Sequence, residues 1–260
     1  MRLAVAAAVL SLALSGGPAV ASADDVLPRV LLTGDSMMGV IEAATSQQLR
    51  LRGFEVDTDS RVGSGITKPF VFDWVTTAPG QARLVAPDVT VVFLGAGDVY
   101  PLRRRGRMVG CCGSQWVAAW SERAAKMTRA WRDDTGRPGA RVYWLTLPTP
   151  RDRGLAKALG VVNRAIRRAV ALAGERAATI DLVPVFTPGR RYRRTMVWEG
   201  RRRVVRQADG VHLAPEGAQI AGATIADALA ADGLSPPGSP LNPGAAARFD
   251  PGRARPVPRG

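Results

Sequence analysis

Short apolar runs alternate with longer stretches of helical periodicity along most of the chain. Runs of strand length lie at 26–33, 54–62, 89–94, 141–147 and 179–186, and apolar residues recur at helical spacing in 37–52, 72–84, 116–132, 153–173 and 215–231. The run Val89 to Leu94 is continuous and largely β-branched, which is typical of a strand covered on both faces. The alternation predicts an α/β fold, a three-layer α/β/α sandwich around a five-stranded parallel sheet.

Two segments break this alternation. Arginine-rich residues 190–206 contain Glu199-Gly200 between two short runs, which predicts a basic β-hairpin insertion with its arginines on the solvent face. Residues 235–260 are rich in proline, glycine and arginine and contain few large apolar residues, which predicts a disordered tail. One catalytic domain is therefore expected at 24–234.

The N-terminus has the pattern of a cleavable signal peptide. Met1-Arg2 precedes an apolar run from Leu3 to Leu14, and the small residues Ala21-Ser22-Ala23 follow a glycine and proline pair. The apolar run is shorter than the ~20 residues that cross a bilayer, and no later run is long enough. We expect a signal peptide at 1–23, cleavage before Asp24, no transmembrane segment afterwards, and a periplasmic or secreted protein.

The formal net charge of +14 comes almost entirely from arginine. Arginine binds carboxylates and phosphates in bidentate geometry, so the charge favours an anionic partner. Nucleic acid is not expected, because of export and because aromatic residues are not interleaved with the basic clusters. An anionic envelope polysaccharide or lipid headgroup fits better, and simple solubility is the alternative.

The only cysteines are the adjacent Cys111 and Cys112, and the only histidine is His212. The cysteines could form a vicinal disulfide, pair with another chain or stay free. Without C-x-x-C spacing or a second histidine, the sequence predicts no metal site.

The first predicted strand ends in Thr33-Gly34-Asp35-Ser36 and is followed at once by a predicted helix. Ligands bind at the carboxyl ends of strands in an open parallel sheet, and a helix N-terminus favours developing negative charge. Ser36 is therefore placed as a nucleophile would be, although an ordinary helix cap would look the same.

A serine nucleophile needs a base to take its proton, and histidine is the usual one near neutral pH. His212 lies three residues after Asp209, in the loop before the last predicted helix. Asp209 is thus available to orient the imidazole and to stabilise its charged form. Ser36, His212 and Asp209 together predict a catalytic triad.

Four sequence blocks in this order resemble those of the SGNH/GDSL hydrolase family: Gly34-Asp35-Ser36, the glycine loop 63–65, Gly95-Ala96-Gly97-Asp98 and Asp209-x-x-His212. The second block precedes Asp73-Trp74, as in bacterial cell-envelope members. The resemblance implies a flavodoxin-like parallel sheet, ester hydrolysis through a Ser-His-Asp triad, and no metal or organic cofactor.

The same resemblance implies an oxyanion hole made of the backbone N–H groups of Ser36 and Gly65, with Gly63 as the less favoured register. The third block departs from the family pattern, because Gly97 stands where the family has an asparagine that supplies a third donor. Loss of one such donor typically costs ~10²- to 10³-fold in rate. Either another side chain or a water replaces it at Gly97, or the enzyme is slow.

The segment 100–113 follows the third block and carries Arg103, Arg104 and Arg105. These arginines are candidates for binding a substrate that carries carboxylates or phosphates, although a solvated charged loop is the more common meaning of such a run. The sequence thus predicts an exported esterase that removes a small acyl group, most simply acetyl, from an envelope glycan or similar ester. An O-acyltransferase on the same triad and a weakened anionic-glycan-binding protein are the alternatives, and the sequence leaves the oligomeric state open.

Overall fold

The computed structural model of the chain describes residues 27–235. The predicted signal peptide, and the predicted tail beyond Ser235, lie outside these residues, so both stay predictions. Within the described part of the chain, no helix is both long and apolar enough to span a bilayer.

The centre of the molecule is a five-stranded sheet in which every neighbouring pair of strands is parallel. Its strands are β1 (Arg29–Gly34), β2 (Glu55–Ser60), β3 (Val89–Phe93), β6 (Arg141–Leu145) and β7 (Ala177–Ile180). Their order in the sheet is β2-β1-β3-β6-β7. This is the flavodoxin-like arrangement, so the predicted fold class is confirmed.

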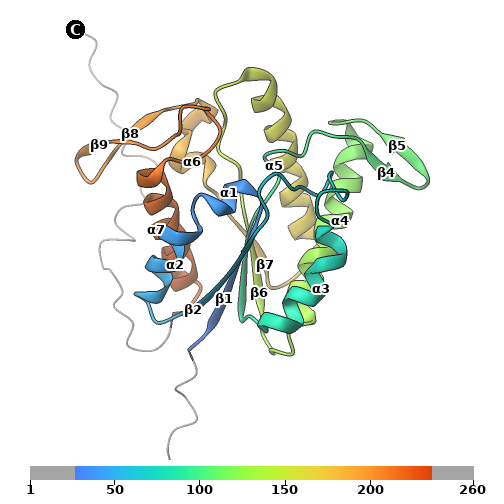
Figure 1. Cartoon of the computed structure of the whole chain (residues 1–260), viewed down its shortest axis with the longest axis horizontal. Helices are drawn as coiled ribbons and strands as arrows, with labels where there is room; N and C mark the ends of the chain where they lie inside the picture. Colours follow the sequence, from blue (N-terminus) through green and yellow to red (C-terminus); the bar gives the residue numbers. More distant parts are fainter. Residues whose placement is uncertain (1–26, 236–260) are drawn as a thin grey trace, which may run out of the picture.

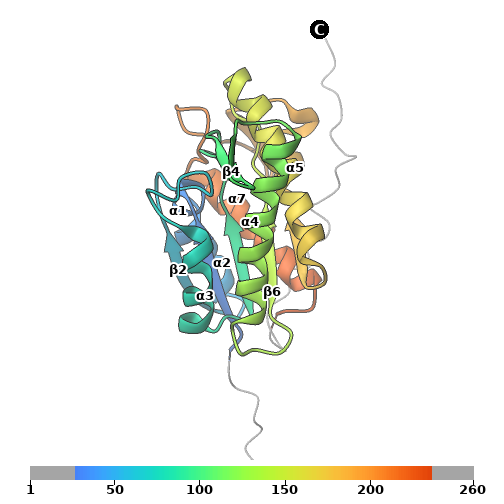
Figure 2. The ribbon, with the colours of Figure 1, turned by 90° about the vertical axis from the view of Figure 1, so that its right-hand side faces the viewer.

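Helices cover both faces of this sheet, as Figures 1 and 2 show. They are α1 (Ser36–Gly39), α2 (Glu42–Arg50), α3 (Trp74–Val85), α4 (Ser114–Asp133), α5 (Arg153–Ala173), α6 (Val183–Phe186) and α7 (Pro215–Ala231), with a 3-10 turn at Pro188–Arg190. Helices α2 and α7 pack together on one face, and α3, α4 and α5 pack side by side on the other (Figure 1).

The core lies between the sheet and these helices. Helix α4 buries Trp120 and Trp131 against Trp144 of β6, with ring centroids 5.8 Å and 6.3 Å away. Buried aromatic side chains of this size contribute much of the hydrophobic stabilisation of a domain. They also fix α4 against the sheet, and α4 in turn contacts the loops at the carboxyl edge.

Two β-hairpins stand at the carboxyl edge of the sheet (Figure 1). The predicted basic hairpin is present as β8 (Thr195–Trp198) and β9 (Arg201–Val204). Its turn residues Glu199 and Gly200 both have positive φ, as a two-residue hairpin turn of the I′ type requires. The second hairpin, β4 (Leu102–Arg104) with β5 (Arg107–Val109), occupies part of the segment expected to be a loop, and Cys111 and Cys112 beyond it are joined in a disulfide.

Two predicted elements differ from the structure. The predicted strand 179–186 is wrong beyond its first two residues, because the chain leaves the sheet after Ile180 and turns into α6. Asp181 Oδ1 accepts a hydrogen bond from Val183 N at 3.1 Å, and Pro184 occupies the first turn of α6, where its missing N–H costs nothing. The predicted helix 37–52 is divided into α1 and α2 near the β-branched pair Val40-Ile41, where Ile41 N bonds to Met38 O in a tight i→i−3 turn.

Candidate active site

The first and third sequence blocks meet where the sheet order reverses. The chain leaves β1 toward β2 on one side, while β3 lies on the other side of β1. Ser36 follows β1 and Gly95 follows β3, and Asp35 N donates a hydrogen bond to Phe93 O at 3.2 Å. Ligand sites of doubly wound sheets lie at such a switch point.

Buried Asp35 fixes the start of α1 and ties it to the third block. Its Oδ1 accepts from Met37 N at 2.8 Å, and its Oδ2 accepts from Gly95 N at 2.8 Å and Ala96 N at 3.2 Å. Burial raises the pKa of Asp35 to about 6, although the N–H groups of Gly95 and Met37 oppose this. Asp35 therefore positions the backbone around Ser36 and is occupied by these bonds.

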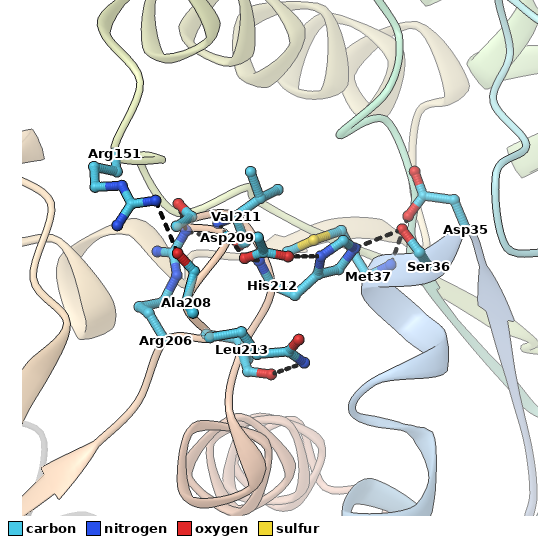
Figure 3. A network of polar contacts seen from close by, with 12 residues as sticks. Asp35, Ser36, Met37, Arg151, Arg206, Ala208, Asp209, Val211, His212 and Leu213 are labelled. Carbon is cyan, nitrogen blue, oxygen red and sulfur yellow. Dashed lines mark hydrogen bonds and ion pairs between the residues drawn. The ribbon is translucent and has the colours of Figure 1, made fainter.

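The structure brings the three predicted triad residues together (Figure 3). Ser36 Oγ lies 2.8 Å from His212 Nε2, and His212 Nδ1 lies 2.6 Å from Asp209 Oδ2. When Nδ1–H is donated to the carboxylate, Nε2 carries the lone pair that accepts the serine hydrogen. This is the geometry in which a histidine can act as base toward a serine hydroxyl.

Asp209 is held by its own loop as well as by the imidazole. Its Oδ1 accepts from Val211 N at 2.8 Å and from His212 N at 3.1 Å. Partial burial raises the pKa of Asp209, but the hydrogen bonds from the His212 side chain and the two backbone N–H groups outweigh burial and leave the pKa below its ordinary value. Asp209 is therefore held as a carboxylate that can accept a hydrogen bond from a neutral or a charged His212 ring.

Arg206 holds the backbone of the loop that carries Asp209 and His212, a role that was not predicted (Figure 3). The sequence interpretation put the arginines of 190–206 in solvent, but Arg206 is fully buried. Its guanidinium donates to Val211 O at 2.7 Å and to Gly210 O at 3.3 Å, and Arg151 donates to Ala208 O at 2.8 Å. A buried guanidinium satisfies several carbonyls at once, so Arg206 fixes the backbone that carries His212.

Asp98 holds the second block against the third. This fully buried carboxylate accepts four hydrogen bonds: Oδ1 accepts from Thr67 N at 2.9 Å and Thr67 Oγ1 at 2.7 Å, and Oδ2 accepts from Ile66 N at 3.1 Å and Trp120 Nε1 at 2.8 Å. A Cβ at Gly65 would collide with Asp98 Oδ1, so only glycine fits there. The motif Gly95-Ala96-Gly97-Asp98 drew attention to the region, but no local pattern predicts that Asp98 binds the other loop.

The glycines expected at the oxyanion hole differ in their surroundings. Gly65 is buried beside Asp98, whereas Gly63 is exposed with open space where its Cβ would be, which favours the Gly65 register. Gly97 offers no side chain, and a Cβ there would lie 2.9 Å from the Nζ atom of Lys68. Sequence reasoning gave Lys68 no role, because a lone lysine in a loop carries no pattern.

The three candidate substrate arginines lie on the β4–β5 hairpin beside α4. Arg104 forms an ion pair with Glu122 at 2.8 Å and a hydrogen bond with Gln115, both on α4, and Arg103 Nη1 donates to Gly106 O at 3.2 Å. Among the described residues, none of Arg103, Arg104 and Arg105 makes a hydrogen bond or ion pair with a triad side chain. Their role in substrate binding stays a prediction.

No set of three or more histidine, cysteine, aspartate or glutamate side chains within 27–235 is arranged to hold a metal ion. The chemistry assembled at the carboxyl edge is that of a hydroxyl, an imidazole and a carboxylate.

Comparison with known proteins identifies the family of the chain. The sequence profile of the family described as "Protein of unknown function (DUF459)" matches residues 29–228. No curated protein sequence matches the chain significantly.

Several solved structures share the fold. A protein from Slackia heliotrinireducens assigned to the SGNH hydrolases is 17% identical with a TM-score of 0.52, over 78% of this chain and 98% of its own. The family two carbohydrate esterase from Clostridium thermocellum is 12% identical with a TM-score of 0.52, over 80% of this chain and 65% of its own. LAE5, an α/β hydrolase from the metagenome of Lake Arreo, is 14% identical with a TM-score of 0.54, over 81% of this chain and 98% of its own. At these identities the likeness establishes the SGNH hydrolase fold.

Proposed function

The chain belongs to the DUF459 family and has the SGNH hydrolase fold, and from this and the geometry of its site we propose that it is an exported serine esterase. Its reaction is the removal of a small acyl group, most simply acetyl, from an ester of a cell-envelope glycan. The observation that carries the proposal is the continuous hydrogen-bonded row from Ser36 Oγ through the His212 ring to Asp209 Oδ2.

The reaction follows from the positions of these atoms. Ser36 Oγ attacks the acyl carbon, its proton moves to His212 Nε2, and the carbonyl π electrons pass to the oxygen. Collapse of the tetrahedral intermediate breaks the ester bond, and His212 returns the proton to the leaving alcohol. Water then repeats the sequence on the acyl-enzyme, releasing the carboxylic acid and restoring Ser36. Asp209 stabilises the imidazolium in both halves.

The intermediate needs donors for its oxyanion. Ser36 is the first residue of α1, and Asp35 and Asp98 fix the loops on either side of it. The backbone N–H groups of Ser36 and Gly65 are proposed to donate to this oxygen. Donors that are already held in place need no reorganisation during the reaction, which is why such sites accelerate acyl transfer.

Three observations support an anionic polymer outside the cytoplasm as the substrate. The sequence pattern of residues 1–23 is that of a signal peptide, the net charge is +14, and Arg201 and Arg202 of the β8–β9 hairpin are exposed at the same edge of the sheet as Ser36. A polyanion lying across this edge would be attracted to these guanidinium groups.

Hydrolysis of p-nitrophenyl acetate by the purified protein tests the proposal. We expect turnover in the native protein and its loss in Ser36→Ala and His212→Ala, with circular dichroism to establish that both variants are folded. Ser46→Ala, which removes a buried serine hydroxyl on α2 that has no hydrogen-bond partner among the described residues, is the matched control and should retain activity. Turnover that survives Ser36→Ala would contradict the proposal.

Acetylated glycans then test the substrate class. Acetate release should be faster from an acetylated uronate polymer than from an acetylated neutral polymer, and added salt should reduce the difference because it screens surface charges. Equal rates on the two polymers would remove the anionic part of the proposal and leave the esterase part intact.

A further inference from the structure

The end of the Lys68 side chain lies between the two glycines of the expected oxyanion hole. Its Cε atom is 3.3 Å from the position of a Cβ on Gly65, and its Nζ atom is 2.9 Å from the position of a Cβ on Gly97. Gly65 belongs to the second block and Gly97 to the third. Lys68 therefore brings a cation to the place where these two blocks meet.

Two contacts hold the ammonium there. Lys68 Nζ donates a hydrogen bond to Gly63 O at 2.6 Å, and it lies 5.8 Å from the centroid of the Tyr100 ring, within the range of a cation–π interaction. An ammonium has three N–H donors, and the Gly63 carbonyl uses one of them. The remaining donors are available to a ligand.

Glycine at position 97 and lysine at position 68 are sterically linked. A Cβ that close to Nζ is tighter than ordinary packing allows, so any larger residue at 97 would have to displace the ammonium. An asparagine at 97 would extend its amide into the same region. The amide of such an asparagine and the Lys68 ammonium would therefore compete for the same space.

We infer that the Lys68 ammonium donates the third hydrogen bond to the oxyanion, in the role that an asparagine amide at position 97 would otherwise have. The inference rests on the proposed esterase function and identifies a further catalytic residue for it. When Ser36 attacks and the carbonyl electrons pass to oxygen, Lys68 donates a hydrogen bond to that oxygen and keeps its proton throughout. A charged donor gives a shorter and stronger hydrogen bond than a neutral amide, so Gly97 need not make the enzyme slow.

An exchange of the two residues tests this. Lys68→Met keeps most of the apolar stem and removes the charge, so kcat should fall by about 10²- to 10³-fold with little change in KM. Gly97→Asn alone should also lower kcat, because the new side chain displaces the ammonium. In the double variant the amide enters the space that Lys68 has left, and kcat should recover by about tenfold or more over Lys68→Met.

Lys126→Met is the matched control, since Lys126 is exposed on α4, and it should leave kcat unchanged. If the role of Lys68 is purely structural, Lys68→Met should lower the unfolding midpoint, and adding an asparagine at position 97 should not restore activity. A loss confined to KM would also overturn the inference, because it would make Lys68 a binding group for a substrate anion.

A second readout does not require turnover. Covalent labelling of Ser36 by a fluorophosphonate places an oxygen in the same hole, so Lys68→Met should slow labelling and the double variant should recover it. If Ser36-dependent turnover or labelling in Lys68→Met stays within about threefold of wild type, the inference about Lys68 is overturned and the proposed esterase function is not. A wild-type protein with neither Ser36-dependent turnover nor Ser36 labelling would overturn the proposed function, and the inference with it.

Discussion

Removing the Asp98 acceptor should destabilise the domain by an amount that depends on the replacement. Four donors converge on this buried carboxylate, two from Thr67 and one each from Ile66 and Trp120. In Asp98→Ala all four lose their acceptor. An unpaired buried donor costs ~1–3 kcal/mol, so even the lower limit gives a loss of about 4 kcal/mol. That is a large part of the ~5–15 kcal/mol that stabilises a typical domain.

Asp98→Asn should cost less, because the amide can choose between two orientations. With Nδ2 in the place of Oδ2 it would face Ile66 N and the Trp120 indole N–H, neither of which can accept. With Nδ2 in the place of Oδ1, the Thr67 hydroxyl can turn to accept, and Thr67 N alone is left unpaired. The second orientation is favoured and predicts a loss of ~1–3 kcal/mol.

Urea unfolding followed by tryptophan fluorescence measures both losses. Asp57→Asn, at a side chain about half exposed on β2, is the matched control and should stay within about 0.5 kcal/mol of wild type. If Asp98→Ala unfolds within about 1 kcal/mol of wild type, or is no less stable than Asp98→Asn, the reasoning from the four hydrogen bonds is refuted.

Three further perturbations follow from the site. The raised pKa of Asp35 means that the folded state binds this proton more tightly than the unfolded chain, so the stabilisation from this group is full below about pH 3.8 and is lost as the pH rises through about 6. In wild type the free energy of unfolding should therefore fall by about 3 kcal/mol between these pH values from this group, and Asp35→Asn should remove that fall. An unchanged pH profile in the variant would contradict the assignment. Asp209→Asn should lower kcat by about 10²- to 10⁴-fold in the p-nitrophenyl acetate assay while the fold is retained, because the amide no longer favours the imidazolium of His212; an unaffected kcat would rule out the orienting role. Gly217→Ala should lower the thermal midpoint measurably, because its Cβ would strike the Val205 carbonyl oxygen where α7 begins, and an unchanged midpoint would show that the backbone moves away freely.

The sequence alone was sufficient for the fold class, and it named three side chains, Ser36, His212 and Asp209, that the structure places in hydrogen-bond contact. Strand and helix periodicities depend on residues close together in the chain. Whether an element is buried on one face or on both is visible in the pattern of apolar and polar residues within that element. Ser36 could be placed because the end of the first strand defines an edge of the sheet, and Asp209 and His212 could be paired because they share one loop. The fifth strand was predicted too long, since an apolar run of that length does not distinguish a strand from a strand followed by a helical turn.

The tertiary structure alone decided which distant polar groups meet. Asp98 and Thr67 are 31 residues apart, and Arg206 and Thr149 are 57 apart, yet their hydrogen bonds hold the two loops on either side of the triad. Arg104 is bonded to α4, which a run of exposed arginines does not reveal. The nearness of Lys68 to Gly97 is of the same kind: it depends on the path of two loops whose backbone is fixed by buried carboxylates. No local periodicity records such a contact, because its free energy comes from burying and pairing groups that only the complete fold brings together.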